Sequence, residues 1–73
     1  MDGSVYSIIE IVGTSDTSWE DAASNAVATA ARTLKDLRIA EVVKQDVTVE
    51  KGKVSQYRVR LNLSFKYIGK NKK

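Results

Sequence analysis

The side chains that most often perform catalysis are absent from this sequence. None of its 73 residues is cysteine or histidine, which excludes thiol nucleophiles, thiolate metal sites, disulfides and imidazole general bases. No serine has an evident base beside it, and no glycine-rich phosphate loop is present. Gly13-Thr14-Ser15 is expected to be the turn between a strand and a helix. We therefore predict that the protein is not an enzyme.

The acidic residues offer the other conventional chemistry, which is metal binding. Asp16, Glu20 and Asp21 lie close together, but they stand where a helix is expected to begin. Carboxylates at a helix N-terminus complement the helix dipole, and that same dipole repels a cation. Calcium also requires about six to eight oxygen ligands, which is more than this group supplies. The sequence therefore assigns no metal ligands within one chain.

Charge and hydropathy indicate a soluble protein. The net charge is only +3, and three lysines lie in the C-terminal residues 69–73. Residues 68–73 are therefore expected to be a solvated basic tail and not a nucleic-acid site. No segment approaches the ~20 apolar residues of a membrane span, and residues 1–4 lack the character of a signal peptide. We expect a cytoplasmic protein without nucleic-acid or membrane partners.

Three segments have the composition of β-strands. Residues 57–67 alternate strictly between apolar and polar side chains, which predicts a strand with one buried and one exposed face. Residues 39–50 alternate less regularly, and Lys51-Gly52-Lys53 then provides a turn. Residues 5–12 do not alternate, because apolar side chains fall on both faces. Both faces of this first strand therefore need cover.

One helix is expected between the first two strands. Either Thr17 with Glu20 or Ser18 with Asp21 forms a capping pattern at its start. An apolar stripe rich in alanine then continues to about Leu37, and its small side chains allow the helix to lie close to a sheet. A single helix covers only one face of that sheet.

Connection lengths predict an α+β fold with the element order β-α-β-β. The helix returns the chain, so the first two strands run parallel, and the tight turn makes the third strand antiparallel to the second. The expected strand order is 1-3-2, with the longest alternating strand in the centre of a three-stranded sheet wrapped on the helix. Parity of the facing residues favours a three-residue turn, whereas a two-residue turn would need a bulge to restore the register. The predicted pairs are Glu50–Val54, Asp46–Arg58 and Lys44–Arg60.

The first strand carries more apolar surface than one small domain buries. Its two faces read Val5, Ile9 and Ile11 on one side, and Tyr6, Ile8 and Val12 on the other. A core of this size supplies roughly 3–5 kcal/mol, and oligomerisation is the usual supplement where disulfides and metals are missing. We therefore expect a single domain over residues 1–73, with an ordered core at 3–67, whose second sheet face contacts other copies.

Four segments of the chain stand in a recognisable order. They are Ile8-Ile9-Glu10-Ile11-Val12-Gly13-Thr14-Ser15, Ser18-Trp19-Glu20-Asp21-Ala22, Ala40-Glu41-Val42-Val43-Lys44-Gln45-Asp46 and Tyr57-Arg58-Val59-Arg60-Leu61-Asn62-Leu63-Ser64-Phe65. With their spacing, they resemble the dodecins, small proteins that assemble as hollow dodecamers and mostly bind flavins. The resemblance implies a homododecamer that sequesters FMN or riboflavin.

The resemblance also places the residues of a flavin site. In flavin-binding dodecins, a tryptophan after the helix stacks on the isoalloxazine, and a glutamine on the third strand binds its pyrimidine edge. Ile39 and Arg58 occupy these positions here, and Gln45 occupies a family position near the pocket. Loss of the ring removes stacking worth about 1–3 kcal/mol, so the implied site is weakened. Arg58 can pair with a flavin phosphate or form a cross-strand ion pair with Asp46, and both interpretations stay open.

A second function is implied by a branch of the same family that lacks the tryptophan. This chain is similar to that branch around Ser18-Trp19 and Arg38-Ile39-Ala40, and calcium binding has been proposed within it. The alternative prediction is therefore a structural or calcium-binding dodecameric cage that no longer binds flavin. Its metal site would combine carboxylates from several copies. Trp19 is expected to be a core residue that does not replace the missing ring.

Overall fold

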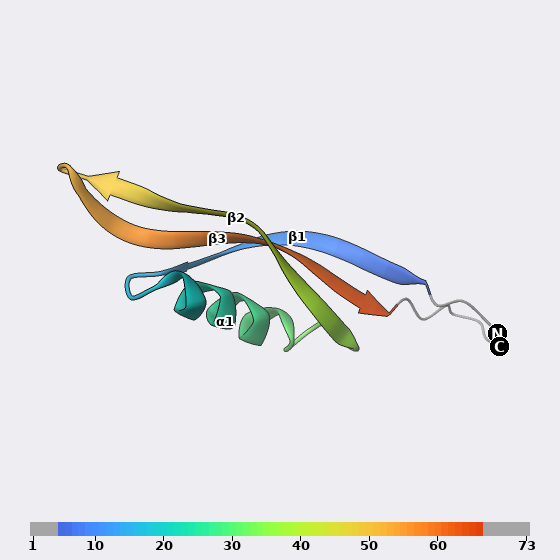
Figure 1. Ribbon diagram of the computed structural model, residues 1–73. Helices are drawn as coiled ribbons and strands as arrows, with labels where there is room; N and C mark the ends of the chain where they lie inside the picture. Colours follow the sequence, from blue (N-terminus) through green and yellow to red (C-terminus); the bar gives the residue numbers. More distant parts are fainter. Residues whose placement is uncertain (1–4, 67–73) are drawn as a thin grey trace.

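A computed structural model describes residues 5–66 as one helix packed on one face of a three-stranded sheet (Figure 1). The strand order is β1-β3-β2, and both outer strands are antiparallel to the central one. The predicted α+β class, element order and strand order are confirmed. The elements are β1 (Tyr6–Ser15), α1 (Trp19–Ala30), β2 (Leu37–Glu50) and β3 (Lys53–Lys66). The proposed tail at 68–73, and the ends of the proposed core at 3, 4 and 67, lie outside the described residues.

Strand β1 is longer than predicted, because it continues through the segment read as a turn. Its pairing with β3 extends to Ser15 opposite Tyr57. Gly13 belongs to this strand and has a packing role. A Cβ atom on Gly13 would collide with the carbonyl oxygen of Ala22 and lie 2.8 Å from the Cβ of Ala26. Glycine is therefore present because the helix backbone approaches the strand closely here.

Helix α1 begins as predicted and ends earlier than predicted. Ser18 is its N-cap, and the Ser18 hydroxyl accepts a hydrogen bond of 2.9 Å from the backbone N–H of Asp21. The helix stops at Ala30 and not near Leu37. Leu34 and Leu37 still pack against the core, but they do so from the segment between α1 and β2 and from the start of β2. The apolar period thus continues past the helix because the next segments face the same core.

The hairpin between β2 and β3 corrects the predicted turn. Glu50 pairs with Lys53, so the turn has two residues and not three. Lys51 and Gly52 both have positive φ angles, 52° and 75°, as a type I′ turn requires. A register shift between Thr48 and Val49 supplies the bulge that a two-residue turn needs. As a result, the predicted Asp46–Arg58 and Lys44–Arg60 pairs are confirmed.

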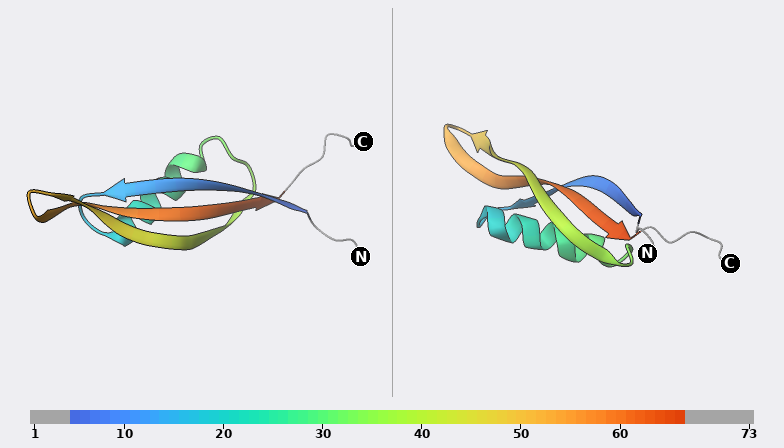
Figure 2. Two further views of the ribbon diagram at one scale, coloured as in Figure 1. Left: turned by 90° about the horizontal axis from the view of Figure 1, so that it is seen from above. Right: turned by 45° about the vertical axis from the view of Figure 1, so that its right-hand side comes forward.

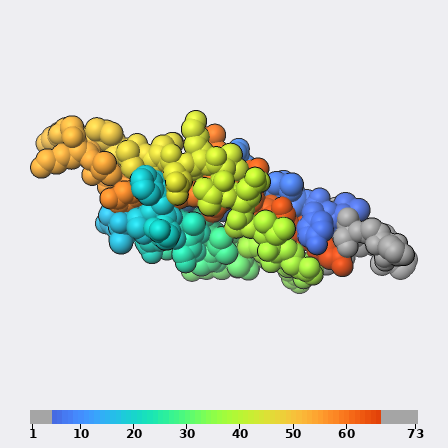
Figure 3. Space-filling view, viewed as in Figure 1, coloured from blue at the N-terminus to red at the C-terminus, as the bar shows by residue number. Residues whose placement is uncertain are grey.

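The core lies between α1 and the facing side chains of β3. Its buried residues are Ala22, Ala26, Val59, Leu61 and Leu63. Trp19 packs against this cluster and meets the ring of Tyr57 edge-on, with the ring centroids 5.1 Å apart. The sheet covers the helix from one side only, as Figure 2 shows from above. The end of the β2–β3 hairpin extends past the helix (Figure 3), and β1 starts beside the end of β3, where Tyr6 pairs with Lys66.

Candidate functional site

The face of the sheet turned away from the helix carries rows of charged and polar side chains. Directly paired residues of an antiparallel sheet project their side chains to the same face. Because Val59, Leu61 and Leu63 face the helix, the even-numbered residues between them face away from it. We call this surface the open face. Its cross-strand rows, read β1–β3–β2, are Thr14–Arg58–Asp46, Val12–Arg60–Lys44, Glu10–Asn62–Glu41 and Ile8–Ser64–Ile39.

The first row contains a bidentate ion pair. Arg58 donates from Nε to Asp46 Oδ1 at 2.7 Å and from Nη2 to Asp46 Oδ2 at 3.0 Å. The hydrogen bond from Arg58 holds the pKa of the Asp46 carboxyl below its ordinary value, and the charges of Arg58, Lys44 and Arg60 act in the same direction. The indole Nε1 of Trp19 donates to the Asp46 backbone carbonyl at 3.0 Å. This strand position is therefore fixed from both faces of the sheet.

The third row brings together oxygen ligands that sequence reasoning missed. Glu10 and Glu41 lie on either side of Asn62, and both glutamates are exposed. Within residues 5–66, no three or more histidine, cysteine, aspartate or glutamate side chains are placed so that they could hold one metal ion. Two carboxylates and an amide offer about five oxygen atoms, of the type that calcium prefers. These oxygens are fewer than the roughly six to eight that calcium takes, so the row alone does not complete a calcium site.

A bulge explains why this row was not predicted. The register shifts between Val42 and Lys44, so Glu41 pairs with Asn62. Extending the parity of the Asp46–Arg58 pair without that shift would place Val42 opposite Asn62 instead. A bulge of this kind leaves no reliable composition signal in residues 40–44.

The three flavin-site residues predicted from the family are not brought together within one chain. Ile39 lies opposite Ser64 on the open face and is 58% exposed. Arg58 shares that face, but six strand positions separate it from Ser64, which is about 20 Å. Gln45 is exposed and pairs with Val59, so it belongs to the other face. A pocket that uses Ile39 and Arg58 on one ring therefore has to combine different copies.

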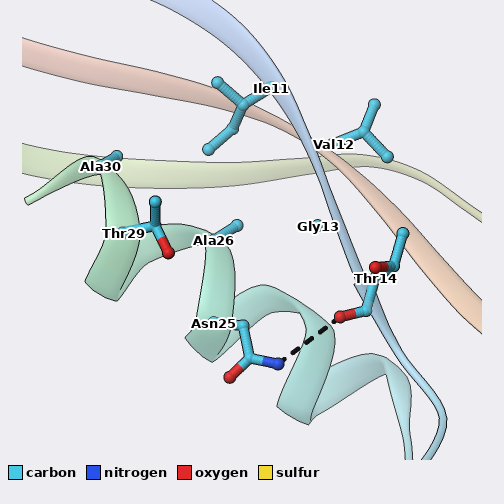
Figure 4. A pocket seen from close by; sticks show the side chains of 8 residues that line it. All are labelled: Ile11, Val12, Gly13, Thr14, Asn25, Ala26, Thr29 and Ala30. Carbon is cyan, nitrogen blue, oxygen red and sulfur yellow. Dashed lines mark hydrogen bonds between the residues drawn. The ribbon is translucent and has the colours of Figure 1, made fainter.

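A hollow in the described part of the chain lies elsewhere, between α1 and β1 (Figure 4). Its volume is about 350 Å³. Asn25 reaches across it, and its Nδ2 lies 3.5 Å from the Thr14 carbonyl oxygen. It contains none of the predicted flavin-site residues, and its lining residues are Ile11, Val12, Gly13, Thr14, Asn25, Ala26, Thr29 and Ala30.

The fold and the open face define a small α+β protein whose sheet is packed against a helix on one face and exposed on the other. The family model described as Dodecin matches residues 5–67. The chain is 48% identical over 63 residues to the protein named calcium dodecin from Mycobacterium tuberculosis, which covers 86% of this chain and 89% of that protein. The chain belongs to the dodecin family, and the resemblance seen in the sequence is confirmed.

Solved structures agree with this assignment. The dodecin from Streptomyces coelicolor superposes with a TM-score of 0.89 at 34% identity. The alignment covers 96% of this chain and 100% of that dodecin. The structure described as the calcium-chelating immunodominant antigen calcium dodecin, from Mycobacterium tuberculosis, has a TM-score of 0.79 at 46% identity. That alignment covers 94% of this chain and 99% of the other. Within residues 5–66, no helix is long and apolar enough to cross a membrane.

Proposed function

We propose that this chain is the subunit of a homododecameric binding protein, and not an enzyme, whose ligand is calcium. The observation that carries the proposal is the 48% identity, over 86% of the chain, to the protein named calcium dodecin. The chemistry of the chain supports it, because the position that the resemblance gives to the flavin-stacking tryptophan is Ile39. Location in the cytoplasm stays a prediction.

The Glu10–Asn62–Glu41 row is the part of the chain that fits a calcium ion. Its three side chains share one face, and they supply carboxylate and amide oxygens only. The outer strands lie about 10 Å apart across β3, a span that two glutamate side chains can bridge above Asn62. Calcium bound there neutralises the carboxylate of Glu41 and competes for that of Glu10 with Arg60, whose Nε lies 3.9 Å from Glu10 Oε2. The remaining ligands come from water or from a neighbouring copy. In the second case, calcium binding requires the assembled protein.

Calorimetric titration of the assembled protein with calcium tests this proposal. Glu41→Gln keeps the size of the side chain and removes one charged ligand, so we expect calcium to bind at least about tenfold more weakly. Glu20→Gln on α1 is the matched control, because Glu20 is exposed in the first turn of the helix. Equal weakening by both substitutions, or no saturable binding by the wild type, would contradict the proposal. Native mass spectrometry of the same samples reports the number of copies.

Flavin binding is the second candidate, favoured by the exposed aliphatic side chain of Ile39. Ile39 is 58% exposed and lies in one row with Ile8, which is 62% exposed. Such a surface offers apolar contact to a flat ring even without stacking. FMN or riboflavin would then lie between copies, with Arg58 near a phosphate or ring oxygen and Gln45 nearby.

Substitution at the stacking position separates the two candidates. If the flavin pocket persists between copies, Ile39→Trp tightens flavin binding by at least about tenfold. Arg58→Gln then sharpens the preference for the isoalloxazine and lowers any preference for FMN over riboflavin. Fluorescence quenching of both flavins by the wild type and the two variants measures this. Equal and weak quenching in all three proteins favours the calcium cage.

A further inference from the structure

Strand β1 has a free edge, because within residues 5–66 it pairs only with β3. The Lys66 N–H of β3 donates to the Asp36 carbonyl at 3.2 Å, beside the start of β2 and away from β1. Lys66 lies opposite Tyr6, and the pairing continues to Ser15 without a register shift. The even-numbered residues of β1 and β3 therefore direct their backbone groups away from each other. On β1, the N–H and C=O groups of residues 6, 8, 10, 12 and 14 lie on the free edge.

The other outer strand, β2, has an edge that is less suited to pairing. Its ladder with β3 contains three register shifts, and bulges twist an edge so that a further strand fits poorly. Strand β1 is regular over all ten of its residues. It also contains no proline, lysine or arginine, the residues that commonly protect an edge. Of the two outer strands, β1 is therefore the one suited to accept another strand.

The hollow between α1 and β1 opens at this free edge (Figure 4). Val12 and Thr14, whose backbone groups lie on the edge, are among its lining residues. Asn25 Nδ2 lies 3.5 Å from the Thr14 carbonyl oxygen. The volume of about 350 Å³ leaves room for an aliphatic side chain. The apolar part of the lining consists of Ile11, Gly13, Ala26 and Ala30.

Ile9 is the side chain of β1 that suits such a hollow. It lies opposite the buried Leu63 and so faces the helix side of the sheet, yet it is 36% exposed. Gly13, four residues further along the same strand, faces the same side and has no side chain to fill the space beside it. One strand thus carries an uncovered aliphatic side chain and a hollow that can receive one. Two copies related by a two-fold axis satisfy both features at once, because an isologous contact uses the same surface twice.

We propose that β1 pairs antiparallel with β1 of a second copy, about a two-fold axis at Ile11. The inference rests on the proposed assembly of identical copies and names one of its contacts. In this register Ile9 of each copy lies opposite Gly13 of the other and enters the hollow, while Glu10 lies opposite Val12. The edge groups of residues 8–14 then form main-chain hydrogen bonds between the copies, and the two sheets become one sheet of six strands.

The charge and the length of β1 disfavour the two neighbouring registers. Pairing centred on Glu10 would place the two Glu10 carboxylates directly opposite each other, which destabilises a sheet. Pairing centred on Ile9 would place Gly13 opposite Val5, which lies outside β1. The hollow would then face no residue of the second strand. The register centred on Ile11 avoids both faults.

Single cysteines report the register, because the chain itself contains none. In the proposed register the two copies of residue 11 form a non-hydrogen-bonded pair with Cα atoms about 4.5 Å apart, which a disulfide spans. The two copies of residue 9 are about 13 Å apart. We therefore expect oxidation of the assembled Ile11→Cys protein to convert the 8.1 kDa chain into a covalent dimer on non-reducing electrophoresis. Ile9→Cys and Glu10→Cys are the matched controls and should stay unlinked.

A second variant makes the test independent of the core, against which Ile11 packs. Glu10 and Val12 are exposed on the open face, and in the proposed register each lies opposite the other in the second copy, about 5.5 Å away between Cα atoms. The double variant Glu10→Cys with Val12→Cys should therefore form covalent dimers, whereas Glu10→Cys alone should not. A calcium chelator in the buffer keeps the calcium row empty throughout.

The outcomes separate this pairing from the proposed function. Links in Ile9→Cys or Glu10→Cys, or no link in both Ile11→Cys and the double variant, overturn the pairing. Native mass spectrometry and calcium titration of the wild type accompany the test. A calcium-binding dodecamer without the expected links means that another contact holds the copies together, so the pairing fails and the proposed function stands. The expected links in a protein without saturable calcium binding support the pairing and contradict the calcium function.

Discussion

The two faces of the sheet differ in how their apolar side chains are covered. On the helix side, Val59, Leu61 and Leu63 are at most 1% exposed. On the open face, Ile8 and Ile39 are 62% and 58% exposed, although they are as apolar as the buried residues. The central strand β3 is thus covered by the helix on one face of the sheet, whereas the opposite face is uncovered. The comparison shows that one chain buries the central strand on one face of its sheet and leaves large apolar side chains exposed on the other.

The largest expected effect comes from damage to the covered face. Leu63→Ala removes a fully buried side chain and leaves a cavity, which costs about 2–5 kcal/mol of the free energy of unfolding. That cost is comparable with the whole stability expected from so small a core. Urea denaturation followed by circular dichroism measures it. Val54→Ala, at a position 53% exposed in the hairpin, is the control and should cost no more than about 0.5 kcal/mol.

Damage to the open face should appear first in the assembly. Ile8→Asp places a charge where we expect a second copy to lie, so it should dissociate the oligomer and remove the stabilisation that assembly contributes. Sedimentation velocity distinguishes a dodecamer from smaller species. Ser24→Asp on the exposed side of α1 controls for added charge. A dodecamer that survives Ile8→Asp would mean that the open face is not an interface.

The smallest expected effect concerns the Asp46–Arg58 pair, which is half exposed. The hydrogen bond from Arg58 lowers the pKa of Asp46 in the folded protein, so the ionised carboxylate stabilises the fold. That stabilisation is present above the ordinary carboxyl pKa and is lost as the pH falls below about 4. Asp46→Asn should therefore flatten the fall in melting temperature between about pH 4 and pH 2. Arg58→Gln should flatten it similarly, and the double variant should add nothing further.

Sequence periodicity predicted the covered face well because burial there is decided within the chain. The strict alternation of residues 57–67 required one dry face, and Leu61 and Leu63 are indeed buried against the helix. The Asp46–Arg58 register was also correct, although the predicted turn was wrong. The turn is one residue shorter than predicted, and the bulge at Thr48–Val49 shifts the register by one residue in the opposite direction. The pairs beyond the bulge are therefore the predicted ones. The apolar face of each strand determines the pairing register, but it does not determine the length of the turn.

Sequence periodicity did not predict the end of the helix, because the segment after the helix faces the same core. Leu34 and Leu37 extend the helical period, yet the helix ends at Ala30, because any segment that faces the core must be apolar there. The candidate site was harder to predict. Ile39, Gln45 and Arg58 came from family resemblance, but Ile39 lies far from Arg58, and Gln45 faces the opposite side of the sheet. Glu10 and Glu41 share a row with Asn62 only because of the bulge after Val42. The apolar side chains on both faces of residues 5–12 predict that copies meet, but the pattern of one chain does not identify which residues of different copies lie together.

The pairing of Tyr6 with Lys66 places the beginning of β1 and the end of β3 side by side. The hairpin turn at Lys51-Gly52 is exposed, and no heavy atom lies within 4 Å of the position of a Cβ on Gly52. A circularly permuted chain that starts at Gly52 and ends at Lys51, with a short linker closing the old ends, would retain all the other strand pairings. The β-α-β-β order is then one of several ways to thread the same architecture, and each threading presents its ends at a different point of the surface.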